Sequence, residues 1–167
     1  KRLEIACGEA PYLVSRYDTV SGKPIDIKDR IGLLDRKIRV INENTKTEDE
    51  WIKWTKRAFQ SIYGFEFQGD SLLLARENLL VSFNDYLMDR FNRDANDEEL
   101  FEISKIISWN IWQMDGLTLT IPFEAKQAPS KQISFFDNTE AKQQVYCVVK
   151  DWRTNKIITF IDLVQEI

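Results

Sequence analysis

The chain has 167 residues, of which 43% are hydrophobic and 30% charged, values typical of one globular domain with a hydrophobic core. It contains no histidine, which excludes Ser-His-Asp triads and histidine-based metal sites, so any chemistry must use carboxylates, backbone groups or a cofactor. The net charge of −4 argues against broad contact between this segment and nucleic-acid phosphates.

The sequence shows no sign of membrane insertion or export. No apolar run approaches the roughly 20 residues of a membrane-spanning helix, and the N-terminus lacks the pattern of a signal peptide. We therefore expect a cytoplasmic protein. Cys7 and Cys147 lie far apart in the sequence and fit no metal-binding or redox spacing, so both are expected to be reduced thiols.

The first expected elements are a strand and a helix. The apolar residues 3–7 predict a buried strand, and the glycine and proline within residues 21–24 predict a turn. Residues 29–44 predict a helix, because apolar residues recur there at spacings of three and four. The predicted buried face consists of Ile31, Leu34, Ile38 and Ile41.

A second helix and a second strand follow. Thr47 with Glu50 forms a capping-box pattern, which predicts a helix start at this point. The β-branched and aromatic residues 61–67 predict a strand. The second helix is expected to direct three residues toward the core, namely Trp51, Trp54 and Ala58.

The next segment predicts two more helices and a third strand. Residues 70–91 form a strong helical pattern with Asp70 as the expected N-cap. Asn96 with Glu99 marks another helix start, and a third strand is expected within residues 110–122. Strands that alternate with long helices predict an α/β domain with a mostly parallel sheet.

The C-terminal part of the chain divides by composition. Residues 125–144 are polar and are expected to form a linker. Residues 145–167 predict a β-hairpin around Thr154 and Asn155, which extends the same domain as the core of residues 1–124.

Residues suited to a nucleoside follow three of the predicted strands, and open α/β sheets bind ligands beyond the carboxyl ends of their strands. Gly8 lets the backbone approach a ligand, and Glu66 can accept both hydroxyls of a ribose. Phe67 can cover an adenine ring, and Asp115 can accept from an exocyclic amine such as adenine N6. We therefore predict a nucleoside-binding crevice at these three strand ends.

The segment LEIACGEAPYL at residues 3–13 resembles the first motif of class I S-adenosylmethionine-dependent DNA adenine-N6 methyltransferases, written Asp-Pro-Ala-Cys-Gly-Ser-Gly-Gly-Phe-Leu. Glu4 stands in place of the aspartate, and Tyr12 in place of the phenylalanine. Four residues match the motif directly: Ala6, Cys7, Gly8 and Leu13.

Two later segments resemble the second and third motifs of that family. IYGFEFQGDSLLLARENLL places Glu66 in the ribose position, and NIWQMDGL places Asp115 where the cofactor adenine would bind. The order of motifs agrees over residues 3–117. The resemblance implies a partial Rossmann-like methyltransferase fold and S-adenosylmethionine as cofactor, bound by Ala6, Cys7, Gly8, Glu9, Glu66, Phe67, Asp115 and Gly116.

Further strings, such as RIGLLDRK and IISWNIWQMDGL, are similar to the modification subunits of bacterial restriction-modification systems. This resemblance implies methyl transfer from S-adenosylmethionine to a flipped adenine, with DNA bound through parts outside this segment. It also allows a specificity or restriction subunit as a partner. The family's catalytic Asn-Pro-Pro-Tyr motif is not in this segment, so we expect a fragment of a larger enzyme that does not methylate DNA by itself.

Three departures of the first motif from the family pattern fall in the loop after Gly8. Ala10 and Pro11 stand where the family has glycine, and neither has the conformational freedom of glycine, which leaves the cofactor affinity of this loop open. Glu9 replaces a serine, and its charge can either pair with the cofactor or point to solvent.

The same residues also have structural interpretations. Gly8 can simply end a strand, and Cys7 can be a small buried filler. Glu66 can be an outward-facing edge residue, and Asp115 can form a turn with Gly116. The alternative function is therefore a non-catalytic, methyltransferase-like interaction or docking module.

The segment KQISFFDN at residues 131–138 resembles the short peptide by which bacterial proteins bind the replication sliding clamp. Its exposed apolar residues suggest a partner, whereas the alternative is that they pack on their own domain. The expected anchors are Gln132, Ile133, Phe135 and Phe136.

Overall fold

The computed structural model describes residues 2–122 and 145–165 and divides the chain into two compact units, Lys1–Gln113 and Met114–Ile167. This division falls after Gln113, whereas the cofactor-binding core was predicted to extend to residue 124. The predicted linker of residues 125–144 lies outside the described residues, as do the sliding-clamp residues Gln132 to Phe136.

A three-stranded parallel sheet forms the centre of the first unit. Its strands are β1 (Arg2–Ile5), β2 (Ile62–Glu66) and β3 (Ile111–Gln113), hydrogen-bonded in the order β1-β2-β3. The predicted α/β class with a parallel sheet is confirmed. The third strand is shorter than predicted, because the chain leaves the sheet after Gln113.

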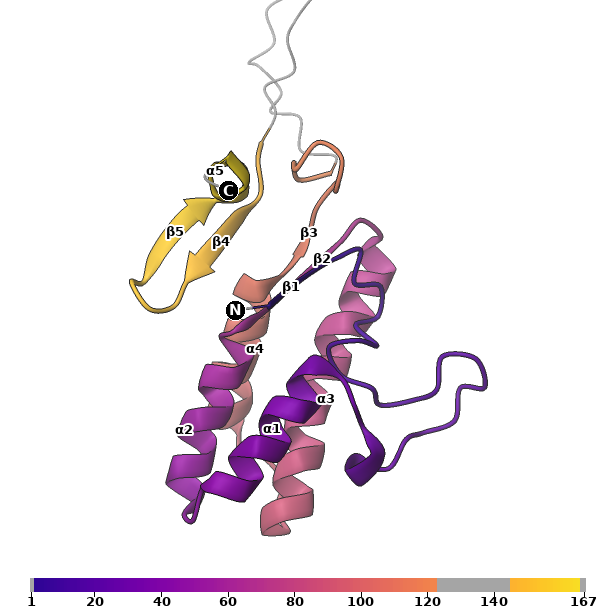
Figure 1. Cartoon of the computed structure of the whole chain (residues 1–167), viewed down its shortest axis with the longest axis vertical. Coiled ribbons are helices and arrows are strands. Elements are labelled where there is room, and N and C mark those ends of the chain that lie inside the picture. Colours follow the sequence, from indigo (N-terminus) through magenta and orange to yellow (C-terminus); the bar gives the residue numbers. More distant parts are fainter. Residues whose placement is uncertain (1, 123–144, 166–167) are drawn as a thin grey trace, which may run out of the picture. The chain divides into compact units, whose positions relative to one another are not determined.

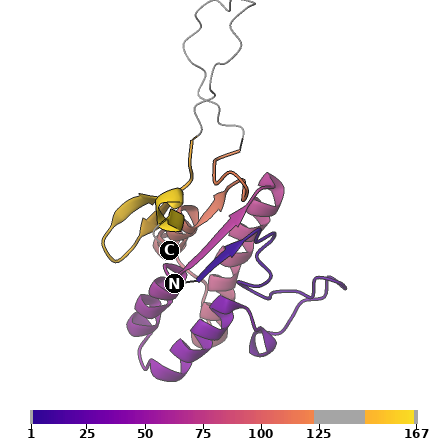
Figure 2. The same ribbon diagram turned by 45° about the horizontal axis from the view of Figure 1, so that its top comes forward.

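Two helices follow each of the first two strands. Helices α1 (Leu33–Asn44) and α2 (Glu48–Phe59) connect β1 to β2, and helices α3 (Gly69–Phe91) and α4 (Asp97–Asn110) connect β2 to β3. Figures 1 and 2 show these four helices gathered on one side of the sheet. A short 3-10 helix, η1 (Ile27–Asp29), precedes α1.

The core between the helices is largely aromatic. The Trp51 and Phe83 rings stack with centroids 6.1 Å apart, and Phe59 meets the edge of Phe83 at 6.1 Å. These rings are fully buried, together with an aliphatic group that includes Leu13, Leu34, Ile38, Leu79, Leu87 and Ile103.

Helix starts follow the predicted capping patterns in most cases. Asn96 accepts from the Glu99 amide and Glu99 accepts from the Asn96 amide, so this capping box is complete. Thr47 accepts from the Glu50 amide, but the Glu50 side chain accepts from the amide of Lys46 instead of Thr47. The N-cap predicted for α3 was wrong. The N-cap is Gln68, two residues earlier, so that Asp70 lies inside the first turn of the helix.

Strand β1 was predicted to be buried, but its Leu3 and Ile5 are 45% and 53% exposed. Two residues predicted to lie on buried helix faces are exposed as well. Ile31 is 69% exposed, because it lies two residues before α1 and so is not on the helix face. Trp54 is 48% exposed, because the buried face of α2 passes from Trp51 through Thr55 and leaves Trp54 at the edge of that face. That face consists of Trp51, Thr55, Ala58 and Phe59.

A buried carboxylate joins α1 to the preceding loop and to α3. Asp35 is 1% exposed, and its Oδ2 accepts from the backbone amides of Ser15 at 2.8 Å and Gly32 at 2.9 Å. Its Oδ1 accepts from the Tyr86 hydroxyl at 2.9 Å. Burial and the Asp35 charge raise the pKa of Tyr86, so the phenol stays protonated and remains a donor.

The second unit contains an antiparallel hairpin and a short helix. Strands β4 (Val148–Asp151) and β5 (Lys156–Thr159) pair, and Asn155 has the positive φ of a tight turn, so the predicted C-terminal hairpin is confirmed. The predicted second strand was too long, because α5 (Phe160–Gln165) begins where β5 ends. Both cysteines of the chain are buried free thiols, as expected.

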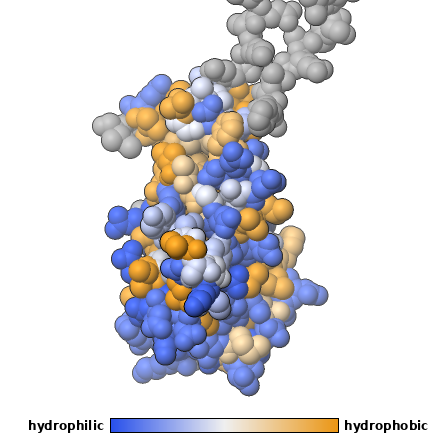
Figure 3. Space-filling model, turned by 90° about the vertical axis from the view of Figure 1, so that its right-hand side faces the viewer, coloured by the Kyte–Doolittle hydropathy of each residue, from blue (hydrophilic) through white to orange (hydrophobic). Residues whose placement is uncertain are grey.

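The surface view in Figure 3 shows a mainly hydrophilic face over the helices, with hydrophobic side chains in separate patches.

Within residues 2–122 and 145–165, no helix has the length and apolar character needed to cross a membrane.

The Asp35 network predicts a large stability effect. Asp35→Ala leaves the Ser15 and Gly32 amides and the Tyr86 hydroxyl without their buried acceptor, so we expect the free energy of unfolding to fall by about 3 kcal/mol. Urea denaturation measures this change. The exposed Asp29→Ala is the matched control, expected to change it by less than about 0.5 kcal/mol, and equal effects of the two variants would contradict the prediction.

Candidate functional site

The loop after β1 is held directly against the end of β2. The Cys7 amide donates to the Phe65 carbonyl at 2.9 Å, which continues the ladder between the strands by one residue. The amide of the next residue, Gly8, donates to the Glu66 Oε2 at 2.7 Å. Residues separated by 58 positions in the sequence therefore meet where two strands end.

Left-handed backbone conformations alternate along this loop. Ala6, Gly8 and Ala10 have φ values of 59°, 54° and 64°. A left-handed alanine costs about 1–2 kcal/mol, so the fold holds both alanines in a conformation that glycine would adopt more easily. Ala10 is fully buried, and its amide donates to the Cys7 carbonyl at 2.8 Å. The loop thus keeps a glycine-like path at Ala10.

Glu66 is 8% exposed and uses both carboxylate oxygens. Oε2 accepts from the Gly8 amide, and Oε1 accepts from the Gln68 amide at 3.0 Å. It is therefore not an outward-facing edge residue. Each carboxylate oxygen has two lone pairs, so each of these oxygens can accept one further hydrogen bond from a ligand hydroxyl.

The Glu9 side chain is engaged within the protein. Its Oε2 accepts a hydrogen bond from the Tyr17 hydroxyl, and its carbonyl accepts from Asn78 Nδ2 at 3.0 Å. Burial and the bond to Glu9 raise the pKa of Tyr17, which keeps the hydroxyl protonated. Tyr17 and Asn78 were not predicted as site residues, although Asn78 belongs to the second resemblance string. Asn78, on α3, donates to the Glu9 carbonyl and to the Tyr17 hydroxyl, so it holds the loop against α3.

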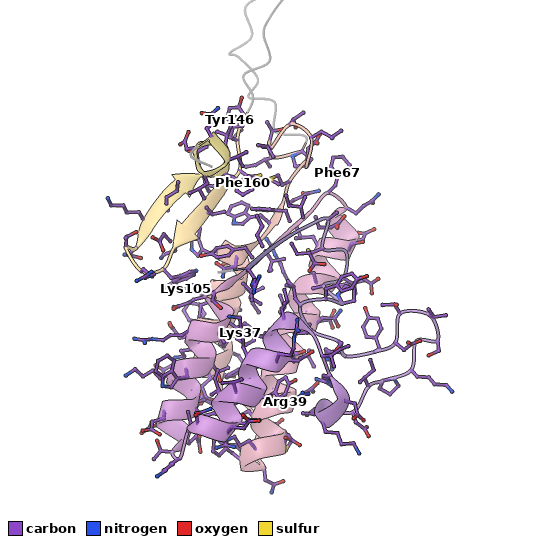
Figure 4. All side chains as sticks on the ribbon, in the orientation of Figure 1. Lys37, Arg39, Phe67, Lys105, Tyr146 and Phe160 are labelled. Carbon is purple, nitrogen blue, oxygen red and sulfur yellow. The ribbon has the colours of Figure 1, made fainter. Side chains whose placement is uncertain are left out.

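Phe67 lies just beyond the end of β2, and its side chain is 46% exposed (Figure 4). Its carbonyl accepts from Gln113 Nε2 at 2.9 Å, so β3 positions the residue through its backbone. The contribution of Gln113 was missed, because an amide side chain at a strand end carries no specific sequence signal.

Cys7 lies at this junction, and its thiol is buried. Burial, together with the charges of Glu4 and Glu66, raises the pKa of Cys7 to about 12, so the thiol is protonated at neutral pH and is a poor nucleophile. Its sulfur would lie 3.0 Å from a Cβ atom at Gly64, so a glycine is needed there to make room for it. This geometry favours the interpretation of Cys7 as a buried filler.

Asp115 and Gly116 belong to the second unit. The Asp115 Oδ1 accepts from the amides of Leu117 at 2.8 Å and Thr118 at 3.3 Å. The bond from Leu117 contributes most to lowering the pKa of Asp115, and the bond from Thr118 contributes less. The carboxylate therefore closes a turn, as the alternative interpretation of this residue expected.

No protein-family model matches the chain, and neither the curated proteins nor the solved structures compared with it give a match. Among the residues that the structure describes, no cluster of three or more cysteine, aspartate or glutamate side chains is arranged to hold a metal ion.

The bonds of Glu66 predict local protection of two backbone amides. Glu66→Gln replaces one acceptor oxygen by an NH₂ group, so the amide of Gly8 or of Gln68 loses its partner. We expect that amide to exchange with solvent at least about tenfold faster in NMR hydrogen-exchange measurements. The exposed Glu77→Gln serves as the control. Unchanged exchange at both amides in the Glu66 variant would be inconsistent with the described geometry.

Glu4 predicts a pH-dependent stability effect. Burial raises the pKa of Glu4 above its ordinary value of 4.5, and its Oε2 has no hydrogen-bond partner among the described residues. Above pH 4.5 the unfolded chain ionises more readily than the folded one, so this residue lowers stability as the pH rises. Glu4→Gln should therefore raise the melting temperature at pH 7 and leave it nearly unchanged at pH 3. A variant that is less stable than the parent at pH 7 would refute this.

Proposed function

We propose that this chain is the cofactor-binding portion of a DNA adenine-N6 methyltransferase that takes its methyl group from S-adenosylmethionine. The observation that supports this most directly is the 2.7 Å bond between the Gly8 amide and the Glu66 carboxylate. It joins the loop after β1 to the acid at the end of β2, within a parallel sheet of order β1-β2-β3. This arrangement is compatible with part of a Rossmann-like methyltransferase fold.

In the proposed complex, the ribose hydroxyls of the cofactor donate to Glu66, whose two oxygens each have a remaining lone pair. Phe67 covers one face of the adenine ring with its exposed side chain. The backbone of Ala6 to Glu9 approaches the methionine part, because no Cβ at Gly8 limits its approach.

The composition is compatible with this role. Transfer of the methyl group to a flipped adenine requires no histidine from this segment, because the motif that holds the adenine is a separate Asn-Pro-Pro-Tyr element in the resembling family. The net charge of −4 assigns contact with DNA to other parts of the enzyme. The proposed membership in a restriction-modification system is based on the sequence strings alone.

A second candidate is a non-catalytic module that keeps the sheet without binding the cofactor. The hydrogen bonds of the loop favour this candidate, because the Gly8 amide already donates to Glu66 and the Glu9 side chain already accepts from Tyr17. Such a loop holds its shape without a ligand. Direct measurement of binding separates the two candidates.

Isothermal titration with S-adenosylmethionine tests the proposal. We expect saturable binding by the parent chain, and affinity at least about tenfold lower in Glu66→Gln, because an acceptor for the ribose is lost. Phe67→Ala should weaken binding to a similar degree through the loss of its ring. The matched controls are Glu77→Gln and the exposed Phe101→Ala on α4, both expected to bind like the parent.

Circular dichroism first establishes that each variant is folded at the temperature of the titration. Absence of binding by the folded parent chain would favour the non-catalytic module. Equal affinity of the parent and the Glu66→Gln variant would contradict the proposed site. Tighter binding of NAD or ATP than of S-adenosylmethionine would leave a nucleoside site but reject the methyltransferase.

A further inference from the structure

A shallow groove lies between α1 and α2, away from the strand ends of the candidate site. Its volume is about 530 Å³. The two helices form an antiparallel hairpin, so residues near the start of α1 face residues near the end of α2. The groove is lined by Arg36, Lys37, Val40, Ile41, Trp54, Arg57, Ala58 and Ser61.

The floor of the groove is apolar and open to solvent. Val40 is 57% exposed and Trp54 is 48% exposed, although both are large hydrophobic side chains. The Arg57 guanidinium lies over the Trp54 ring, 4.9 Å from its centroid, which orients both side chains along the groove. An apolar strip between two packed helices is the surface on which a third helix can pack.

The rim of the groove is basic. Arg36, Lys37 and Arg57 line it, no acidic side chain lines it, and none of the three cations forms an ion pair with a described residue. This concentration of positive charge is notable in a chain with a net charge of −4.

Another cation of α1, Arg39, has a different role from the three that line the groove. Figure 4 shows Lys37 on the side of α1 toward α2 and Arg39 on the opposite side. Arg39 donates to the carbonyls of Lys28 and Arg30, so its charge is used within the fold. The acidic residues of α2, namely Glu48, Asp49 and Glu50, lie in its first turn, at the other end of the helix pair. The three rim cations therefore lie at the end of the helix pair away from these acids.

We propose that this groove binds an acidic amphipathic helix of a partner protein. The lining residues of α2, from Trp54 to Ala58, span about 6 Å along the helix axis, enough to contact roughly one turn of a partner helix. Apolar side chains of that helix would cover Val40 and Trp54, and its carboxylates would pair with Arg36, Lys37 and Arg57. Three cations around an apolar floor suit a helix better than duplex DNA, whose binding relies on many phosphate contacts.

The test uses two synthetic peptides of about 18 residues, labelled with fluorescein. Both carry a leucine stripe at helical spacing, with glutamate on the flanking positions of one and lysine on those of the other. Fluorescence anisotropy should show binding of the glutamate peptide with a Kd of about 100 μM, as expected for a small interface, and no binding of the lysine peptide. Amide NMR shifts should change at α1 and α2.

Variants make the test specific. Trp54→Ala and Arg57→Glu should each weaken binding of the glutamate peptide at least about tenfold. The control Lys105→Glu changes charge equally on exposed α4 and should bind like the parent. The double variant Lys37→Glu with Arg57→Glu should instead bind the lysine peptide, because its rim charge is reversed.

Several outcomes would overturn the proposal. Equal binding of the two peptides would show that the basic rim has no role, and equal weakening by Lys105→Glu would show only non-specific charge attraction. Sedimentation equilibrium that reveals a dimer lost in Trp54→Ala would assign the groove to a second copy of the chain. Binding of duplex DNA that Arg57→Glu abolishes, without peptide binding, would assign it to nucleic acid.

Discussion

The hydrogen bond from the Gly8 amide to the Glu66 carboxylate is the interaction on which the candidate site depends. It connects two loops that the sheet alone would leave independent beyond their strands. The same carboxylate accepts from the Gln68 amide, just before α3 begins. A buried acid with two backbone donors is well satisfied, whereas the donors left without it would be costly to bury. One side chain thus sets the path of the chain at two strand ends.

Asp35 has an equivalent role at the start of α1. It bonds the amides of Ser15 and Gly32 and the hydroxyl of Tyr86, so it fixes the long segment between β1 and α1 against α3. Both acids therefore accept hydrogen bonds from backbone amides of neighbouring loops. Glu66 in this way holds the loop after β1 in place without a ligand.

Most of the helices could be predicted from the sequence, because their signals are local. The Asn96 and Glu99 capping box acts within four residues, and the spacing of Leu34 and Ile38 identifies the buried face of α1. The predictions of burial and of element type failed where contacts between residues distant in the sequence determine the structure. Trp54 was assigned to the core, but Thr55 occupies the inward position and Trp54 lines a surface groove. The helix after β5 was missed, because its apolar residues suit a strand equally well.

Local patterns in the sequence identify the alternation of strands and helices, the lack of histidine, and a glycine and an acid at two strand ends. They do not identify the contact of Gly8 with Glu66, the bond between Glu9 and Tyr17, or the groove that three cations share. The difference lies in how far apart the interacting residues are along the chain. Periodicity and capping act over a few neighbouring residues, whereas these contacts join residues that only the packing of parallel strands and helices brings together.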